Sequence, residues 1–495
     1  MKQRFLALLC TVIICLSAAG CEKTPAPEPI PETETPAEST PQLQDPLLCD
    51  FQVVYTRSIQ RNLDTVDIFE TAPADDLQLR LYQTENRDRV TMGRLQNTMG
   101  ETSMYAWEIP ADGSIHWYDA ETDQWLKQPL EEGTYTASMI ELAMEDGSSY
   151  LIYLPKTYRK QEADVLEYLP AHNGSLTAAR NETGWRFDLV TSLPDESCVS
   201  DFTMVQGVRP MLNWEHDYCG NLWKHYTMET EGKWCFDGYY WPCPENYIPT
   251  GENYLYRCAA GYLIRSLCNT ARIHPAADNL TLAMLDTMVL EQNEAGYWAT
   301  TPRSDWLYTD YGIDEGFYDT RFNSDLMETF RKYYRFAGGD VFREAMERYV
   351  SFYVDFAEKE HFSTESGGWF IPDYTPYTTR KPHASLNHLL AECIVLYHLS
   401  EDLEMPHLTD LADRILLAIS DTQEDWINDS GDLHYCVFPE GDFGLQDYPY
   451  LTYNDLLDTQ NLLLKTREQT NPTLQFLMEH KLRWMEENDI TEYKK

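Results

Sequence analysis

The apolar residues of this chain change their spacing near residue 200. Before that point they alternate with other residues, as in Leu77, Leu79 and Leu81, which single residues separate. After about residue 253 they recur every three or four positions, as in the stripe over residues 341–354. The first spacing matches the two-residue repeat of a strand and the second the 3.6-residue repeat of a helix. We therefore expect a multidomain α+β protein, in which a β-rich part precedes a helical part.

Residues 47–200 are expected to form a β-rich, sandwich-like domain. Asp146-Gly147 is a hairpin turn signal, an apolar run follows at 150–154, and alternation returns from Trp185 to Val190. Short alternating runs separated by turn residues are typical of antiparallel sheets packed face to face. Residues 201–250 are rich in aromatic side chains and are expected to be a connecting segment.

Residues 251–490 carry a helical repeat. Helices are expected at 252–272, 278–293, 320–337, 341–354, 385–402, 406–423, 453–468 and 472–487. Their connections are alternately short and long, which predicts stacked helical hairpins that can curl into an (α/α) toroid with the long connections at one mouth. A helical solenoid or an irregular bundle is the alternative.

The first 46 residues are expected to be a targeting signal followed by a tether. Lys2 and Arg4 precede a short apolar stretch, and small residues precede Cys21, which resembles the signal of a bacterial lipoprotein (residues 1–20). Residues 21–46 are rich in Pro, Glu and Thr and are expected to be extended. These features predict a protein held at the bacterial cell surface or envelope by lipid on Cys21. Ala18 stands where such signals prefer Leu, and simple secretion after cleavage by a different peptidase is the alternative.

The charge of the chain limits its partners. It has 81 acidic and 38 basic side chains, a formal net charge of -43, so binding of nucleic acid through a basic groove is not expected. The 33 Tyr and 13 Trp are expected mostly to fill cores, but so many also fit a groove that binds a ligand. Cys219, Cys235 and Cys243 lie close in sequence and one disulfide among them is plausible. Their spacing is not that of a zinc site, so no metal is expected.

Residues that can bind a ligand or transfer protons are concentrated in the three long connections. Residues 312–323, 367–387 and 429–454 each contain clusters of Tyr, His, Arg and Asp. If the connections share one mouth, these clusters line one concave site, although capping and loop packing can also explain each cluster alone.

The later connections also carry a resemblance to a known family. The run G-G-W-F-I-P-D-Y-T-P-Y-T-T-R-K-P-H-A-S-L-N-H-L-L starts at Gly367, and S-G-D-L-H-Y and then T-Y-N follow before an amphipathic closing helix. This order resembles the C-terminal helical domain of the D-glucuronyl C5-epimerases, over roughly residues 319–487. The resemblance implies a β-rich N-terminal part, an (α/α) domain, and inversion of carbon 5 of hexuronic acids within a polysaccharide.

The resemblance also implies site residues. The family's essential tyrosines correspond to Tyr374 or Tyr377, to His434 with Tyr435 beside it, and to Tyr453; His434 departs from the family pattern. Candidate substrate-binding residues in the same connections are Tyr318, Arg321, Trp369, Arg380, Lys381 and His383.

Epimerisation explains why such residues would be needed. A base takes the proton next to the carboxylate and an acid returns one on the other sugar face, while Arg321, Arg380 or Lys381 neutralises the developing enediolate. Tyrosine titrates near 10, so a cation would have to lower its pKa. The reaction requires no metal or cofactor. The alternatives are a glycoside hydrolase or lyase, in the hydrolase case with Asp314 or Glu315 opposite Asp373, and a non-catalytic glycan-binding lipoprotein.

The predicted anchor can be tested directly. We expect Cys21→Ala to release the protein from the membrane fraction without changing its melting temperature, because the tether separates the lipid from the fold. Cell fractionation and thermal denaturation measure the two effects. A variant that stays with the membrane would mean that another anchor exists.

Overall fold

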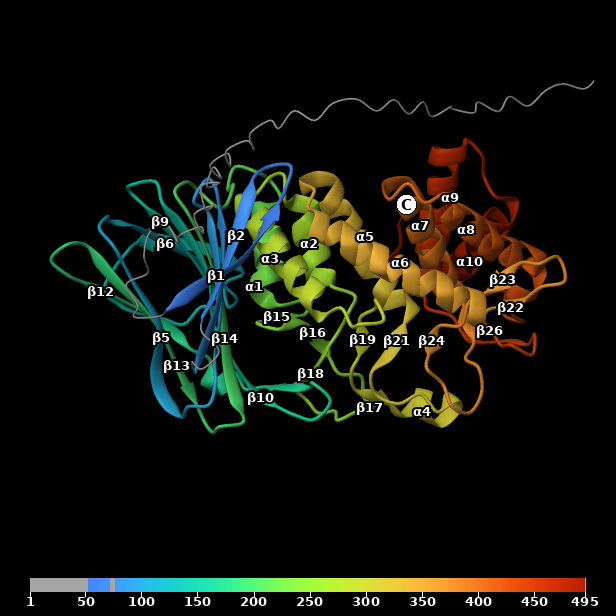
Figure 1. The fold of residues 1–495 in the computed structure, drawn as a ribbon, viewed down its shortest axis with the longest axis horizontal. Helices are drawn as coiled ribbons and strands as arrows, with labels where there is room; N and C mark the ends of the chain where they lie inside the picture. Colours follow the sequence, from blue (N-terminus) through green and yellow to red (C-terminus); the bar gives the residue numbers. More distant parts are fainter. Residues whose placement is uncertain (1–51, 72–75, 495) are drawn as a thin grey trace, which may run out of the picture. The chain divides into compact units, whose positions relative to one another are not determined.

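A computed structural model describes residues 52–71 and 76–494, which all belong to one compact unit (Figure 1). The predicted signal, the tether, Cys21 and Cys49 lie outside the described residues. In the part of the chain that is described, no helix is both long and apolar enough to cross a membrane.

The β-rich part contains one large antiparallel sheet. Its main strands follow the order β1 (Val53–Gln60), β2 (Thr65–Thr71), β3 (Leu77–Thr84), β4 (Arg89–Leu95), β14 (Cys198–Gly207), β10 (Ser149–Lys160), β11 (Leu166–Tyr168), β18 (Tyr254–Arg257), β16 (Gly238–Pro242) and β15 (Lys233–Cys235). Strands β9 (Met139–Met144), β6 (Gly113–Asp119) and β7 (Gln124–Pro129) extend it beside β10.

A second sheet packs on the first. It is ordered β5 (Gly100–Ile109), β13 (Trp185–Leu193), β12 (Ser175–Arg180) and β8 (Gly133–Tyr135). Leu79 and Leu81 of the large sheet and Trp107 and Phe187 of the small one share a buried core, as the two-residue alternation requires. The prediction of a β-rich, sandwich-like part is confirmed.

The large sheet continues beyond residue 200, because β15, β16 and β18 pair into it. Arg94 on β4 ties this extension to the rest. Its guanidinium donates to Asp201 at 2.7 and 2.8 Å and to Asp237 at 2.7 and 2.8 Å. Only 5% of Arg94 and 4% of Asp201 are exposed. The predicted domain limits stay predictions.

The helical part consists of hairpins. Helices α2 (Tyr262–Thr270), α5 (Thr320–Ala337), α7 (Leu386–Asp402) and α9 (Leu451–Arg467) pack in a row, and each also packs against the helix that follows it: α3 (Pro275–Glu291), α6 (Asp340–Glu360), α8 (His407–Asp421) and α10 (Pro472–Glu487). In Figure 1 these helices run from green through yellow to red. The prediction of a helical C-terminal part is therefore confirmed.

Two predictions near the junction, the start of one helix and a disulfide, are wrong. The helix expected at 252–272 begins only at Tyr262, because the alternating residues Tyr254–Arg257 form β18 and pair with β11 and β16. The aromatic segment contains a further helix, α1 (Cys219–Met228). Cys219, Cys235 and Cys243 are all free thiols, so none of them forms the disulfide that their proximity in sequence suggested.

Short strands join the three long connections. Strand β21 (Phe317–Asp319) of the first pairs with β24 (Tyr374–Thr375) of the second, and β19 (Ala299–Thr300) pairs with the other edge of β21. Strand β25 (Ala384–Ser385) of the second pairs with β26 (His434–Val437) of the third, which also pairs with β27 (Phe443–Gln446). Strands β17 (Tyr247–Ile248) and β20 (Arg303–Ser304), strands β22 (Phe362–Ser363) and β23 (Trp369–Phe370), helix α4 (Asp305–Tyr311) and two short 3-10 helices, η1 (Pro170–His172) and η2 (Gln423–Trp426), complete the described elements.

The Arg94 network gives a stability prediction. We expect Arg94→Ala to lower the free energy of unfolding by about 3 to 5 kcal/mol, because it leaves the buried Asp201 carboxylate without a counter-charge. Arg186→Ala is the control, since the Arg186 side chain is half exposed and pairs with Asp188; it should cost less than about 1 kcal/mol. Urea denaturation measures both, and equal losses would contradict this account of Arg94.

Candidate active site

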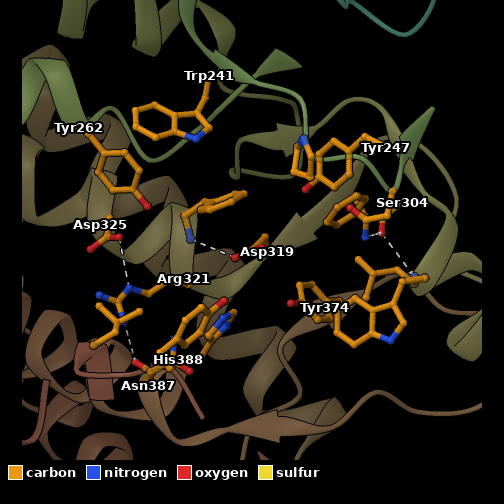
Figure 2. Close-up of a pocket in the computed structure, with 18 of the residues that line it drawn as sticks. Trp241, Tyr247, Tyr262, Ser304, Asp319, Arg321, Asp325, Tyr374, Asn387 and His388 are labelled. Atoms are coloured by element: carbon orange, nitrogen blue, oxygen red, sulfur yellow. Dashed lines mark hydrogen bonds and ion pairs between the residues drawn. The ribbon is translucent and has the colours of Figure 1, made fainter. Parts of the chain in front are cut away.

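A cavity of about 600 Å³ lies where the long connections meet α2, α5, α7 and the segment around β16 (Figure 2). Nine of its 22 lining residues are aromatic, and they are Trp241, Tyr247, Tyr262, Trp306, Phe317, Phe322, Tyr374, Tyr435 and Tyr448. The acidic, basic and histidine residues that line the cavity are Glu231, Arg265, Asp319, Arg321, Asp325 and His388. Aromatic walls with a few polar groups are typical of sites that bind sugar rings.

Asp319 is placed by two elements at once. It ends β21, where it pairs with Tyr374 of β24, and it caps α5 by accepting the Phe322 amide at 3.0 Å. An aspartate at this position satisfies one of the unpaired amides of the first helical turn. Only 5% of the residue is exposed. Burial raises the pKa of Asp319 to about 7, so near neutral pH it can either accept or donate a proton.

His388 lies in the first turn of α7 and lines the same cavity. Its Nδ1 is 2.7 Å from the Thr320 hydroxyl and 3.6 Å from the Asp373 carboxylate. Burial lowers the pKa of His388 to about 4, although Asp373 acts in the opposite direction. The imidazole is therefore neutral at neutral pH, and it can form a hydrogen bond with a ligand without carrying charge.

Asp373 supports the site from behind and does not line the cavity. Its carboxylate accepts the Ser385 amide at 2.8 Å and the Ser385 hydroxyl at 2.5 Å, and it lies 3.2 Å from Nε2 of His383. Burial acts to raise the pKa of Asp373, but the neighbouring His388 and His383 and these hydrogen bonds outweigh it and hold the pKa below its usual value. Asp373 is therefore an ionised positioning residue.

The tyrosines of the cavity wall keep their protons. Burial raises the pKa of Tyr374 and of Tyr435 well above 10, and nearby carboxylates act in the same direction. From the sequence, a neighbouring cation is expected to lower the pKa of a catalytic tyrosine. At Tyr374 and Tyr435 the pKa is raised instead. Tyr374 and Tyr435 can thus donate hydrogen bonds as phenols but are poor bases.

Arg321 links the cavity to the helices beneath it. Its guanidinium donates to Asp455 at 2.7 and 3.2 Å, to Asp325 at 3.2 Å and to the Asn387 carbonyl at 3.1 Å. Its charge is therefore shared with two carboxylates. Arg265 is less constrained, because its side chain is 40% exposed and lies 3.7 Å from Asp325.

Three of the predicted site residues, Arg321, Tyr374 and Tyr435, line the cavity together. Others lie apart from it. Tyr318 is fully buried and shares a hydrogen bond of 3.0 Å with Tyr349. The Trp369 ring stacks on His361 with 3.7 Å between ring centroids.

The remaining predicted residues make local contacts outside the cavity. Tyr377 donates to the Glu360 carboxylate and Lys381 to the Glu360 carbonyl, while Arg380 donates to the Asp310 carbonyl. His383 is buried and shares a hydrogen bond of 2.6 Å with Tyr311.

His434 begins β26, and Tyr453 packs against Tyr493 with ring centroids 5.3 Å apart. Neither lines the cavity. The carboxylates considered for hydrolysis do not line it either: Asp314 and Glu315 are exposed and Asp373 is buried behind it.

The sequence argument missed Asp319 and His388 as site residues. Both stand in the connections that it singled out, but Asp319 precedes a helix and has the sequence appearance of a simple cap. Trp241 and Tyr262 lie at the junction of the β-rich and helical parts, and no local pattern links them to the long connections. In Figure 2 these two rings lie across the cavity from Tyr374 and His388.

The raised pKa of Asp319 predicts a pH-dependent stability. Between its usual value of 3.8 and its value of about 7 in the folded protein, the unfolded carboxyl ionises while the folded one stays protonated. Unfolding therefore becomes more favourable as the pH rises through this range. Relative to Asp319→Asn, which keeps a capping side chain, the unmodified protein should lose roughly 2 to 4 kcal/mol between pH 4 and pH 8. Urea denaturation at several pH values measures this difference, and a constant difference would contradict the assignment.

No protein-family model and no curated protein match this sequence. Among solved structures, the chain is similar to a family 76 glycoside hydrolase from a bovine Bacteroides thetaiotaomicron strain, with a TM-score of 0.38 and 10% identity over 83% of this chain and 77% of that chain. It is also similar to D-mannose isomerase (TM-score 0.36, 12% identity, 46% of this chain and 60% of that chain) and to cellobiose 2-epimerase from Spirochaeta thermophila (0.34, 16%, 47% and 59%). The last two matches span less than two thirds of those proteins.

Proposed function

We propose that this protein is a carbohydrate-active enzyme that transfers protons at a hexuronic acid residue of a polysaccharide, like the C5-epimerases that its sequence resembles. The observation that carries the proposal is Asp319, a buried carboxyl with a pKa of about 7 in an aromatic-walled cavity. Acid–base catalysts work best when their pKa lies near the working pH. The row of helical hairpins is the arrangement from which an (α/α) toroid is built.

The residues of the cavity have distinct roles in this proposal. The ionised form of Asp319 takes the proton from the carbon next to the sugar carboxylate. A neutral phenol of the wall, Tyr262, Tyr374 or Tyr435, returns a proton to the other face, and solvent then restores both groups. Arg265 balances the charge of the enediolate, with Arg321 held beside it by Asp325 and Asp455.

Asp319→Asn tests the proposal. We expect this change to reduce the incorporation of solvent deuterium at carbon 5 of a hexuronic acid polymer by about 10² to 10⁴-fold, because the amide cannot accept the proton. Mass spectrometry of the recovered polymer measures the incorporation, and binding of the polymer should change little. A protein that binds the polymer without any exchange would be a glycan-binding protein.

Tyr453→Phe distinguishes the role that the resemblance implies for Tyr453 from the role that the cavity geometry predicts. The resemblance makes Tyr453 essential, so loss of its hydroxyl should abolish exchange. The cavity geometry predicts an activity within about twofold of the unmodified protein, because Tyr453 packs against Tyr493 outside the cavity. We expect the second result, and Tyr374→Phe, which changes a phenol of the wall, is the matched variant.

A glycoside hydrolase is the second candidate. Asp325 stands in α5, the helix that Asp319 caps, and lines the same cavity. The raised pKa of Asp319 also suits the general acid of a glycosidase. This function would shorten the polymer without exchange at carbon 5. Size-exclusion chromatography of the products distinguishes the two reactions.

The cellular location remains part of the proposal. The signal-like segment and Cys21 favour a lipid-anchored protein of the bacterial envelope, where a polysaccharide substrate is accessible. This rests on the sequence pattern alone.

A further inference from the structure

A second cavity, of about 680 Å³, adjoins the first. It is lined by residues of α2, α5, α7 and α9, so it occupies one side of the row that these helices form. Arg265, Arg321, Asp325 and Leu451 line both cavities. A chain that fills the first cavity can therefore continue into the second.

The charge of the second cavity is opposite to that of the whole chain. Six cationic side chains line it, and they are Arg265, Arg321, Arg331, Lys332, Lys465 and Lys494; its carboxylates number four. Over the complete sequence, acidic residues outnumber basic ones by 81 to 38. A cavity with more cationic than anionic side chains favours an anionic ligand. In so acidic a protein, these local cations offset the repulsion between such a ligand and the rest of the surface.

Most of these cations are engaged by neighbouring acids. Arg321 pairs with Asp325 and Asp455. Arg331 pairs with Glu328 and Asp402.

Lys494 pairs with Asp458. Among the described residues, Lys332 on α5 and Lys465 on α9 have no carboxylate within ion-pair distance and both are exposed. The carboxylates of the cavity are thus already occupied, and these two ammonium groups are available to a ligand.

We infer that the second cavity is a binding site for further acidic sugar residues of the same polysaccharide, whose carboxylates Lys332 and Lys465 bind. The inference rests on the proposed function, because it extends the substrate from one reacting residue to a polyanionic chain. It also explains how a protein with a net charge of -43 can hold such a substrate.

The test uses the full chain and fluorescently labelled polyglucuronate. We expect Lys332→Gln/Lys465→Gln to weaken binding about tenfold at low salt, since each exposed ion pair contributes roughly two- to fivefold in affinity. The remaining binding should depend less on salt concentration. Binding of neutral mannan, measured alongside, should not change with the substitutions.

Lys127→Gln/Lys160→Gln is the matched control, because it removes the same charge from the exposed faces of β7 and β10. Equal weakening in both double variants, or an unmodified chain that does not bind polyglucuronate, would overturn the inference. Binding that depends on Lys332 and Lys465 without deuterium exchange would support the inference and reject the epimerase proposal. Exchange in an unmodified chain whose binding is insensitive to both lysines would reject only the inference.

Discussion

Main-chain hydrogen bonds between the long connections hold the candidate site together. Strand β21 pairs with β24, and β25 pairs with β26, so three segments that follow different helices become one wall. The pairing puts Asp319 next to Tyr374 at the entry to α5. The Asp319 carboxyl is buried there, and this desolvation raises its pKa. Strand pairing thus fixes the position of Asp319, and burial sets its pKa.

The two cavities beside the row formed by α2, α5, α7 and α9 differ in their charged side chains. The first cavity combines aromatic rings with Asp319 and a neutral His388, and its arginines are balanced by carboxylates. The second cavity contributes the ammonium groups of Lys332 and Lys465, which form no ion pair among the described residues. Under the proposed function, the first region would carry out the proton transfer and the second would hold the polysaccharide by its charges. Asp325 and Asp455 also restrain Arg321, a side chain that lines both cavities.

Several predictions from sequence were close to the observed structure. The helix expected at 320–337 is α5, and that expected at 472–487 is α10, because each has a strong apolar stripe and a cap or proline at its start. Residues from all three long connections, among them Arg321, Tyr374 and Tyr435, line one cavity. The predicted roles of Tyr377, His434 and Tyr453 came from motif order, which carries no information on the direction of a side chain.

The sequence by itself determined the change from strands to helices and the concentration of tyrosine, histidine and arginine between the helices. Both are local properties, set by the spacing of apolar residues along the chain. Only the tertiary structure decided which of those side chains face one cavity, brought Trp241 and Tyr262 to it, and left two lysines unpaired beside it. It also decided the protonation of Asp319 and His388, because the pKa of a group depends on burial and on neighbours distant in sequence, which a linear pattern does not specify.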